Sequence, residues 1–178
     1  MGEMAKRLYL EDLTVGQTFC SAPQVVTAEE ITKFAAQFDP QPFHLDEREA
    51  KQTFFQGLAA SGWHTASLAM RCLVESVPLA GGIIGTVVEE LRWLKPVRSG
   101  DVLRLETEVL HIEPGNRAHG VAKLKSATVN QHGETVQVLT ATLIVSKLNL
   151  WVFFGPFGKI PSILSWKSCA AVIGLVTW

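Results

Sequence analysis

An acidic and a basic side chain stand close together in the segment FDPQPFHLDEREA, residues 38–50. Asp39 and His44 flank Pro40 and Pro42, and each proline stiffens the chain because its ring fixes its own φ angle. A carboxylate and an imidazole that converge on one point can deprotonate a water molecule and return a proton elsewhere, which is general acid–base catalysis. On spacing alone a structural role is the simpler interpretation, because an Asp before Pro commonly forms a turn.

A second segment, GLAASGWHTASL, residues 57–68, leads into an apolar stretch that is expected to be a helix. Gly62 is expected at or next to the N-terminus of this helix, where backbone N–H groups lack intrahelical partners and the helix dipole favours negative charge. Such an N–H can stabilise an oxygen that becomes negative in a transition state. The alternative is that Gly62 only permits close packing.

The composition of the chain is that of a globular protein. Its 178 residues correspond to one domain, and 47% hydrophobic with 19% charged residues exclude disorder. A net charge of −1 argues against a nucleic-acid binder. Cys20, Cys72 and Cys169 have no repeating spacing, which excludes a disulfide scaffold or Cys-based zinc site and suits a reducing compartment. The N-terminus shows no signal peptide or membrane anchor, so the expected location is the cytoplasm.

Hydrophobic periodicity predicts three helices. The first begins with the capping-box pattern Thr27-Ala-Glu-Glu30 and ends at Phe38, since the next residue precedes a proline. A short second helix is expected from Asp46 through about residue 52. The third, residues 62–77, is apolar nearly all round, which is typical of a buried helix.

Alternating or continuous apolar runs predict a long antiparallel sheet. A sheet must bury its apolar face, and the helix at residues 62–77 is the only candidate long enough to cover it. The expected fold class is therefore α+β, a sheet wrapped around one central apolar helix. The predicted strands span residues 17–26, 83–97, 102–112, 120–129 and 134–145.

The end of the chain has a different composition. All 17 acidic residues precede residue 135, and only Lys159 and Lys167 carry charge in the segment 148–178. These lysines and two prolines interrupt the apolar runs, so a membrane-spanning helix is not expected. Three interpretations stay open for this tail: an arm that packs on a partner subunit, an interfacial segment, or sequence foreign to the fold.

Taken together, these motifs resemble those of the MaoC-like dehydratases, which include the R-specific enoyl-CoA hydratases and have the hot-dog fold. The resemblance rests on FDPQPFHLDE, the glycine 18 residues after His44, the buried helix, the strand ending LRWLKPVRSGD and the opening LEDLTVGQTF. It implies one hot-dog domain over residues 1–147. It also implies a homodimer or a higher homo-oligomer in which two sheets join edge to edge and each site lies near the subunit interface. It also implies reversible hydration of a 2-enoyl-CoA to a 3-hydroxyacyl-CoA without a metal or redox cofactor.

The resemblance also implies roles for individual residues. Asp39 and His44 would jointly hold the water that adds to C3 and manage the proton that reaches C2. The N–H of Gly62 would bind the thioester carbonyl. Ser67, five residues beyond that glycine, would support the catalytic pair, although a structural role is equally open.

This sequence also departs from the family pattern. Ser61 stands where many members have a histidine, and Trp63 replaces a smaller side chain, so it is expected to change the wall of the substrate pocket. Arg92, with Lys95 and Arg98, is a candidate contact for the CoA phosphates, while solvation is the usual role of such side chains.

Three other functions are alternatives to hydration. A hot-dog thioesterase would use Asp39 to direct water onto the carbonyl carbon. A catalytically silent acyl-CoA or acyl-carrier binding module would tolerate loss of Asp39 or His44, yet both are present. A hydrolase built on Ser61, His44 and Asp39 is excluded, because the serine lacks the G-x-S-x-G context.

Overall fold

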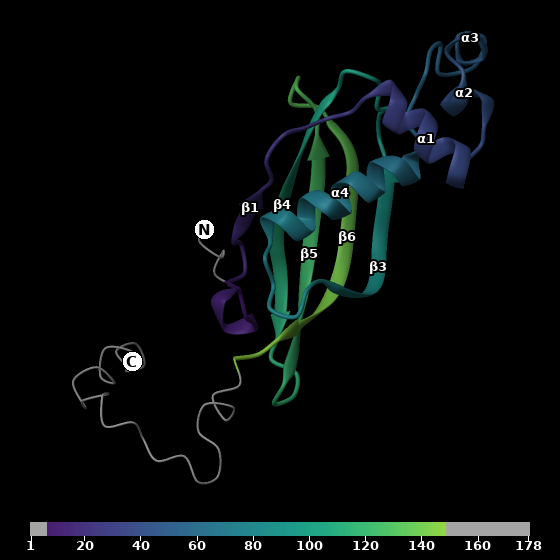
Figure 1. Ribbon diagram of the computed structural model, residues 1–178. Helices are drawn as coiled ribbons and strands as arrows, with labels where there is room; N and C mark the ends of the chain where they lie inside the picture. The colour runs from purple at the N-terminus through teal and green to yellow at the C-terminus, as the bar shows by residue number, and fades with distance from the viewer. Residues whose placement is uncertain (1–6, 149–178) are drawn as a thin grey trace, which may run out of the picture. The chain divides into compact units, whose positions relative to one another are not determined.

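A computed structural model describes residues 7–148 of the chain, and the predicted apolar tail lies outside these residues except for Leu148. The described part is a curved antiparallel sheet packed on one long helix (Figure 1). This confirms the predicted fold class. In chain order the elements are η1 (Leu10–Asp12), β1 (Thr18–Cys20), β2 (Gln24–Val25), α1 (Ala28–Phe38), α2 (Pro42–Leu45), α3 (Glu47–Ala50), α4 (Gly62–Ser76), β3 (Ile84–Trp93), β4 (Val102–Glu113), β5 (His119–Val129) and β6 (Thr135–Ser146).

The strands lie in the order β1-β4-β5-β6-β3, and β2 adds a short pairing to β4. The four long strands match the predicted ones to within a few residues, but the single strand predicted at residues 17–26 is broken. Pro23 lies between its two halves and has no amide hydrogen for a ladder bond. Beside it, the Ser21 hydroxyl accepts the Leu105 N–H at 2.9 Å. Two short strands therefore replace one.

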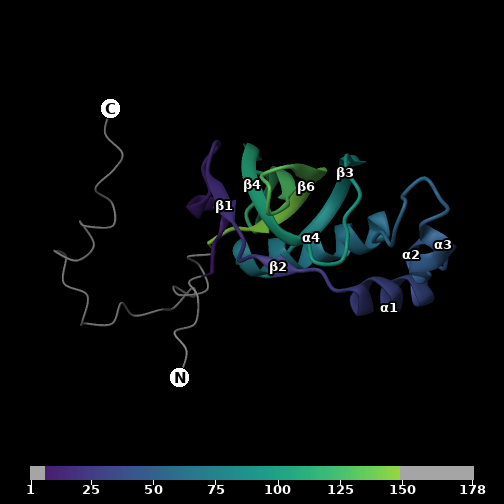
Figure 2. The same ribbon diagram turned by 90° about the horizontal axis from the view of Figure 1, so that it is seen from above.

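The sheet arches over α4, so the main core lies between its concave face and the helix (Figure 2). On the helix, Ala69, Cys72 and Leu73 are buried against strand residues that include Leu105 and Leu124. No helix within residues 7–148 is long and apolar enough to cross a membrane.

The prediction that α4 is a buried helix holds for only one side of it in the single chain. Trp63, Met70 and Val74 are 59%, 45% and 52% exposed. The physical reason is that the sheet covers one side of the helix, while these three side chains project from the remaining surface.

The three other helices gather at the N-terminal end of α4 (Figures 1 and 2). The capping box predicted for α1 is confirmed: the Thr27 hydroxyl accepts the Glu30 N–H, and the Thr27 N–H donates to the Glu30 carboxylate. The helix ends at Phe38, as predicted. Buried Ile31 joins α1 to a second apolar cluster formed with strand and loop residues. This packing fixes the end of α1 beside the start of α4.

Residues 42–45 form a short helix that is not among the helices predicted from the sequence. Pro42 occupies the first helical position, where a missing N–H costs nothing and its φ angle already suits the helix. Asp46 then caps α3 by accepting the Arg48 and Glu49 N–H groups. The prolines therefore position His44 by starting a helical turn as well as by stiffening the chain.

Candidate active site

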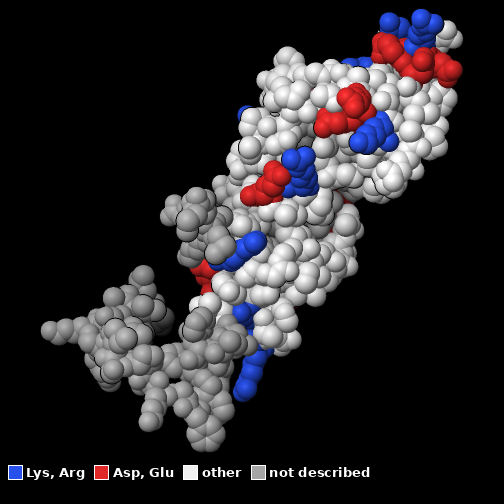
Figure 3. Space-filling model, viewed as in Figure 1, with Lys and Arg blue, Asp and Glu red and all other residues white. Residues whose placement is uncertain are grey.

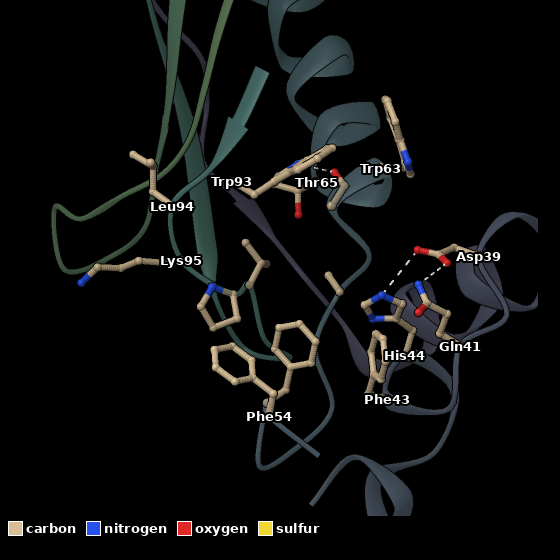
Figure 4. Close-up of a pocket in the computed structure, with 15 residues that line it drawn as sticks. Asp39, Gln41, Phe43, His44, Phe54, Trp63, Thr65, Trp93, Leu94 and Lys95 are labelled. Atoms are coloured by element: carbon tan, nitrogen blue, oxygen red, sulfur yellow. Dashed lines mark hydrogen bonds and ion pairs between the residues drawn. The ribbon is translucent and has the colours of Figure 1, made fainter. Parts of the chain in front are cut away.

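Asp39 and His44 meet at the junction of α1 and α2. His44 Nε2 lies 3.4 Å from Asp39 Oδ2 (Figure 4). Asp39 is the C-cap of α1, and its N–H donates to the Ala35 carbonyl at 2.9 Å. His44 is buried, with 4% of its surface exposed. The structure thus brings together the two residues that the sequence singles out first.

The backbone selects one neutral form of the His44 ring. His44 Nδ1 lies 2.7 Å from the Ala59 carbonyl oxygen. A carbonyl can only accept, so Nδ1 carries the hydrogen, and in the neutral ring Nε2 presents a lone pair. Nε2 and the Asp39 carboxylate oxygen are then two acceptors that face each other. A water molecule on the side of the cavity can donate one O–H to each of them, because 3.4 Å is short enough for one oxygen to reach both atoms.

Two hydrogen bonds hold the Asp39 carboxylate in place. The Ser61 hydroxyl donates to Oδ2 at 2.6 Å, and the Gln41 side-chain amide donates to Oδ1 at 2.8 Å. These bonds, with that from Ser61 as the largest contribution, hold the pKa of Asp39 below its usual value. Ser61 is completely buried. Asp39 is therefore an oriented, ionised carboxylate at neutral pH.

Gly62 is the first residue of α4, and Ser61 is its N-cap. The Ser61 hydroxyl accepts the Trp63 N–H at 3.2 Å, while the Gly62 N–H has no acceptor within the helix. A Cβ added to Gly62 would lie 2.6 Å from Trp93 Cε2, and Trp93 Nε1 donates to the Gly62 carbonyl at 2.8 Å. The close-packing role is therefore present, and it leaves the N–H at the positive end of the helix dipole.

These groups line one cavity of about 570 Å³. Asp39, His44 and the start of α4 form one wall, and the end of β3 with the following residues, Trp93 to Val97, forms the opposite wall (Figure 4). Phe54, which is 92% exposed, stands at the rim. The acid–base pair and the helix N-terminus thus face a common space large enough for a small ligand.

Two other predicted site residues lie on α4. Trp63 lines the cavity and meets Trp93 edge to face, with ring centroids 5.3 Å apart. Ser67 is exposed, is not among the cavity-lining residues, and its hydroxyl donates to the Trp63 carbonyl at 2.8 Å. The serine that contacts Asp39 is Ser61. A Ser directly before an apolar helix is an N-cap signal, and this signal could have identified Ser61 as the N-cap of α4.

The basic residues proposed for phosphate contacts have different surroundings. Arg92 is exposed, pairs with Glu90 at 2.9 Å and is not among the cavity-lining residues. Lys95 lines the cavity and pairs with Glu134. Arg98 donates to the Phe55 and Leu58 carbonyls. Arg98 therefore fixes the loop before α4.

The arrangement of Ser61, Asp39 and His44 is also not that of a serine hydrolase. Ser61 contacts Asp39, and Asp39 contacts His44, so the carboxylate lies between the hydroxyl and the imidazole. In a hydrolytic triad the imidazole must lie in the middle to deprotonate the serine. Within residues 7–148, no group of three or more His, Cys, Asp or Glu side chains is arranged to hold a metal ion.

Comparison with known proteins identifies the family of the chain. Residues 12–131 match the MaoC-like domain family. The YdeM protein of Bacillus subtilis is 33% identical over 123 residues, which cover 68% of this chain and 87% of that protein. The 3-hydroxybutyryl-CoA dehydratase of Methylorubrum extorquens is 31% identical over 110 residues, 62% of this chain and 69% of that enzyme.

A solved structure gives the same result. The MaoC-like dehydratase from Rhodospirillum rubrum superposes with a TM-score of 0.76 and 51% sequence identity, covering 79% of this chain and 98% of that one. The match includes more than half of the chain and the segments that carry Asp39, His44 and Gly62. This chain therefore belongs to the MaoC-like family and has its hot-dog fold.

Proposed function

We propose that the protein is a hydro-lyase that reversibly hydrates a 2-enoyl-CoA thioester to a 3-hydroxyacyl-CoA. The observation that carries the proposal is the pair of acceptors, His44 Nε2 and Asp39 Oδ2, 3.4 Å apart on the wall of the cavity that also contains Gly62. The Methylorubrum extorquens relative is named for dehydration of such a thioester.

In the proposed reaction, a water molecule donates one hydrogen to Asp39 and one to His44. As its oxygen bonds to C3, His44 Nε2 accepts a proton, and the C2=C3 electrons move toward the thioester carbonyl oxygen. The Asp39 carboxylate stabilises the imidazolium that forms. The proton on His44 Nε2 then passes to C2 and the carbonyl double bond re-forms. His44 is neutral again, and the product contains both hydrogens of the water.

The carbonyl oxygen gains negative charge while the C3–O bond forms. The Gly62 N–H is suited to this charge because it begins a helix of 15 residues and has no intrahelical acceptor. A donor of this kind contributes to rate mainly in the transition state, where the charge is largest. Gly62 is therefore assigned to the carbonyl and the Asp39–His44 pair to the water.

The direct test uses crotonyl-CoA and two readouts. We expect loss of the ultraviolet absorbance of the enoyl thioester without release of free thiol, which a thiol reagent would report. Thiol release would instead make the protein a thioesterase with Asp39 as its base. No reaction, together with measurable binding of crotonyl-CoA, would support a silent acyl-CoA binding module.

The exposed apolar surface around β3 supports a homodimer. Among the described strands, β3 pairs with β6 alone, so its other edge is open. Val87 and Val88 on β3 are 51% and 62% exposed, and Met70 and Val74 on α4 are exposed to a similar degree. The face that carries α4 shows broad uncharged areas between isolated charged groups (Figure 3). We propose edge-to-edge joining of two β3 strands, which sedimentation would report as twice the chain mass.

Replacing Ser61 with Ala should change the pH dependence of hydration. The substitution removes the strongest bond that lowers the Asp39 pKa, so this pKa rises. A carboxylate with a raised pKa is protonated earlier on acidification. We therefore expect the acid limb of the kcat/KM profile to move to higher pH. The lost N-cap also lowers the free energy of unfolding by about 1 kcal/mol.

Thr27→Ala is the matched control. Thr27 caps α1 as Ser61 caps α4, but its hydroxyl contacts Glu30 and does not contact Asp39. Its loss should lower stability by a similar amount and leave the acid limb in place. An unshifted acid limb in Ser61→Ala would remove Ser61 from the positioning of Asp39.

A further inference from the structure

Two buried polar side chains in the sheet lack hydrogen-bond partners. Gln137 is 1% exposed, and neither its amide nitrogen nor its amide oxygen bonds to any described residue. Thr128 is 3% exposed, and its hydroxyl likewise has no partner among the described residues. Buried polar groups are almost always paired, and each exception in a native protein needs an explanation.

The strand register puts these side chains together, facing α4. Gln137 on β6 is directly opposite Thr128 on β5 and directly opposite Trp93 on β3. Directly opposite residues project from the same face of a sheet with Cβ atoms about 5 Å apart. Trp93 bonds to the Gly62 carbonyl of α4, so this face is the one that the helix covers. The row Thr128–Gln137–Trp93 therefore crosses the concave face beneath α4.

This row begins at the wall of the candidate active site. Trp93 lines the cavity, and Gln137 is the next side chain inward. Thr65, a buried residue of α4, also lines the cavity and lies near Trp93 (Figure 4). Neither Gln137 nor Thr128 lines the cavity, so an acyl chain that enters between Thr65 and Trp93 reaches Gln137 first and Thr128 second only when the side chains there move apart.

A neighbouring pair on the same sheet shows what a purely structural arrangement looks like. Thr107 and Ser126 are also buried and directly opposite each other, and their hydroxyls bond at 2.9 Å. Thr107 and Ser126 thus hydrogen-bond to each other, whereas the side chains of Thr128 and Gln137 have no partner among the described residues. Unpaired buried polar groups lower the stability of the fold. Residues that bind a ligand often have this effect in the free protein, because their partner is the ligand.

We propose that Gln137 and Thr128 form a polar inner end of the acyl site, which selects thioesters whose acyl chain ends in a neutral hydrogen-bonding group such as a hydroxyl. This inference rests on the proposed hydratase function. The amide offers two donors and an acceptor, and the hydroxyl offers one donor and accepts. Both side chains are neutral, and burying an unpaired carboxylate beside them would be costly. A hydroxyl or ketone therefore suits the site better than an acid.

The test compares hexenoyl-CoA with ω-hydroxyhexenoyl-CoA. We expect the wild type to favour the hydroxylated thioester in kcat/KM by about tenfold, the effect of one well-made buried hydrogen bond. Gln137→Leu and Thr128→Val should each bring this ratio towards one. Both variants should also melt at a higher temperature, because each removes an unpaired buried polar group. An unchanged ratio in both variants would overturn the proposal.

Thr107→Val provides the matched control on the same face of the sheet. It leaves Ser126 without its partner, so its melting temperature should fall while the preference between the two thioesters stays the same. If the wild type hydrates neither thioester, the hydratase proposal fails separately. Dissociation constants for hexanoyl-CoA and ω-hydroxyhexanoyl-CoA then test the inference alone. Tighter binding of the hydroxylated compound supports it, and equal or weaker binding overturns it.

Discussion

Asp39→Asn should lower the rate of crotonyl-CoA hydration by about 10²–10⁴, the usual effect of removing an acid–base group. The amide keeps the size of the carboxyl and can still hydrogen-bond with Ser61 and Gln41, so the fold should persist. The neutral amide is a weaker acceptor for the O–H of the water than the carboxylate, and it has no negative charge to stabilise a protonated His44. The measurement is kcat/KM at neutral pH, with circular dichroism to verify folding.

Asp46→Asn is the matched control for this substitution. Asp46 caps α3, and Asn caps helices equally well, so the control should keep both stability and activity. His44→Asn provides a second single variant whose amide N–H can still donate to Ala59. If Asp39 and His44 act as a unit, the double variant should be little slower than the worse single variant. Full activity of Asp39→Asn would remove the pair from the reaction.

Gly62→Ala should reduce activity much more than it reduces stability. The new Cβ would lie 2.6 Å from the indole of Trp93, which must then move. Trp93 is 44% exposed, so it can shift at the cost of its bond to the Gly62 carbonyl, about 1 kcal/mol. The shift changes the cavity wall beside the assigned carbonyl site. Misplacement of reacting groups by about 1 Å can cost about 10²-fold in rate.

A double-mutant cycle identifies the cause of this loss. Trp93→Phe removes the same hydrogen bond and presents a smaller ring. If contact with the indole is responsible, Gly62→Ala should cost less activity in the Trp93→Phe background than in the wild type. Equal costs in both backgrounds would point to the backbone of Gly62 itself, independent of the ring.

The main elements of the fold could be predicted because their signals are long. Ten or more residues of alternating or helical pattern define β3 to β6, α1 and α4, and the capping box places the start of α1. The short helix that carries His44 could not be found this way, since its four residues complete hardly more than one turn. The partly exposed side of α4 was also missed, because an apolar pattern does not show which neighbour covers it.

The site was predictable where chemistry and local sequence coincide. Asp39, His44 and Gly62 all line the cavity. Ser67 was expected to support the catalytic pair because of its spacing from Gly62. The serine that contacts Asp39 is Ser61, because the end of α1 meets the start of α4, and sequence spacing does not reveal this contact. Gln137 stands in an apolar strand and gives no motif. The role proposed for it rests on the strand register, which sets it beside Trp93.

The groups assigned to the reaction lie within one short stretch, residues 39 to 62, whereas the sheet is assembled from strands far apart in the chain. Most of this stretch lies outside the main core between the sheet and α4. A duplicated gene altered only within this segment would lose the proposed turnover in a single step, while every strand of the sheet keeps its sequence.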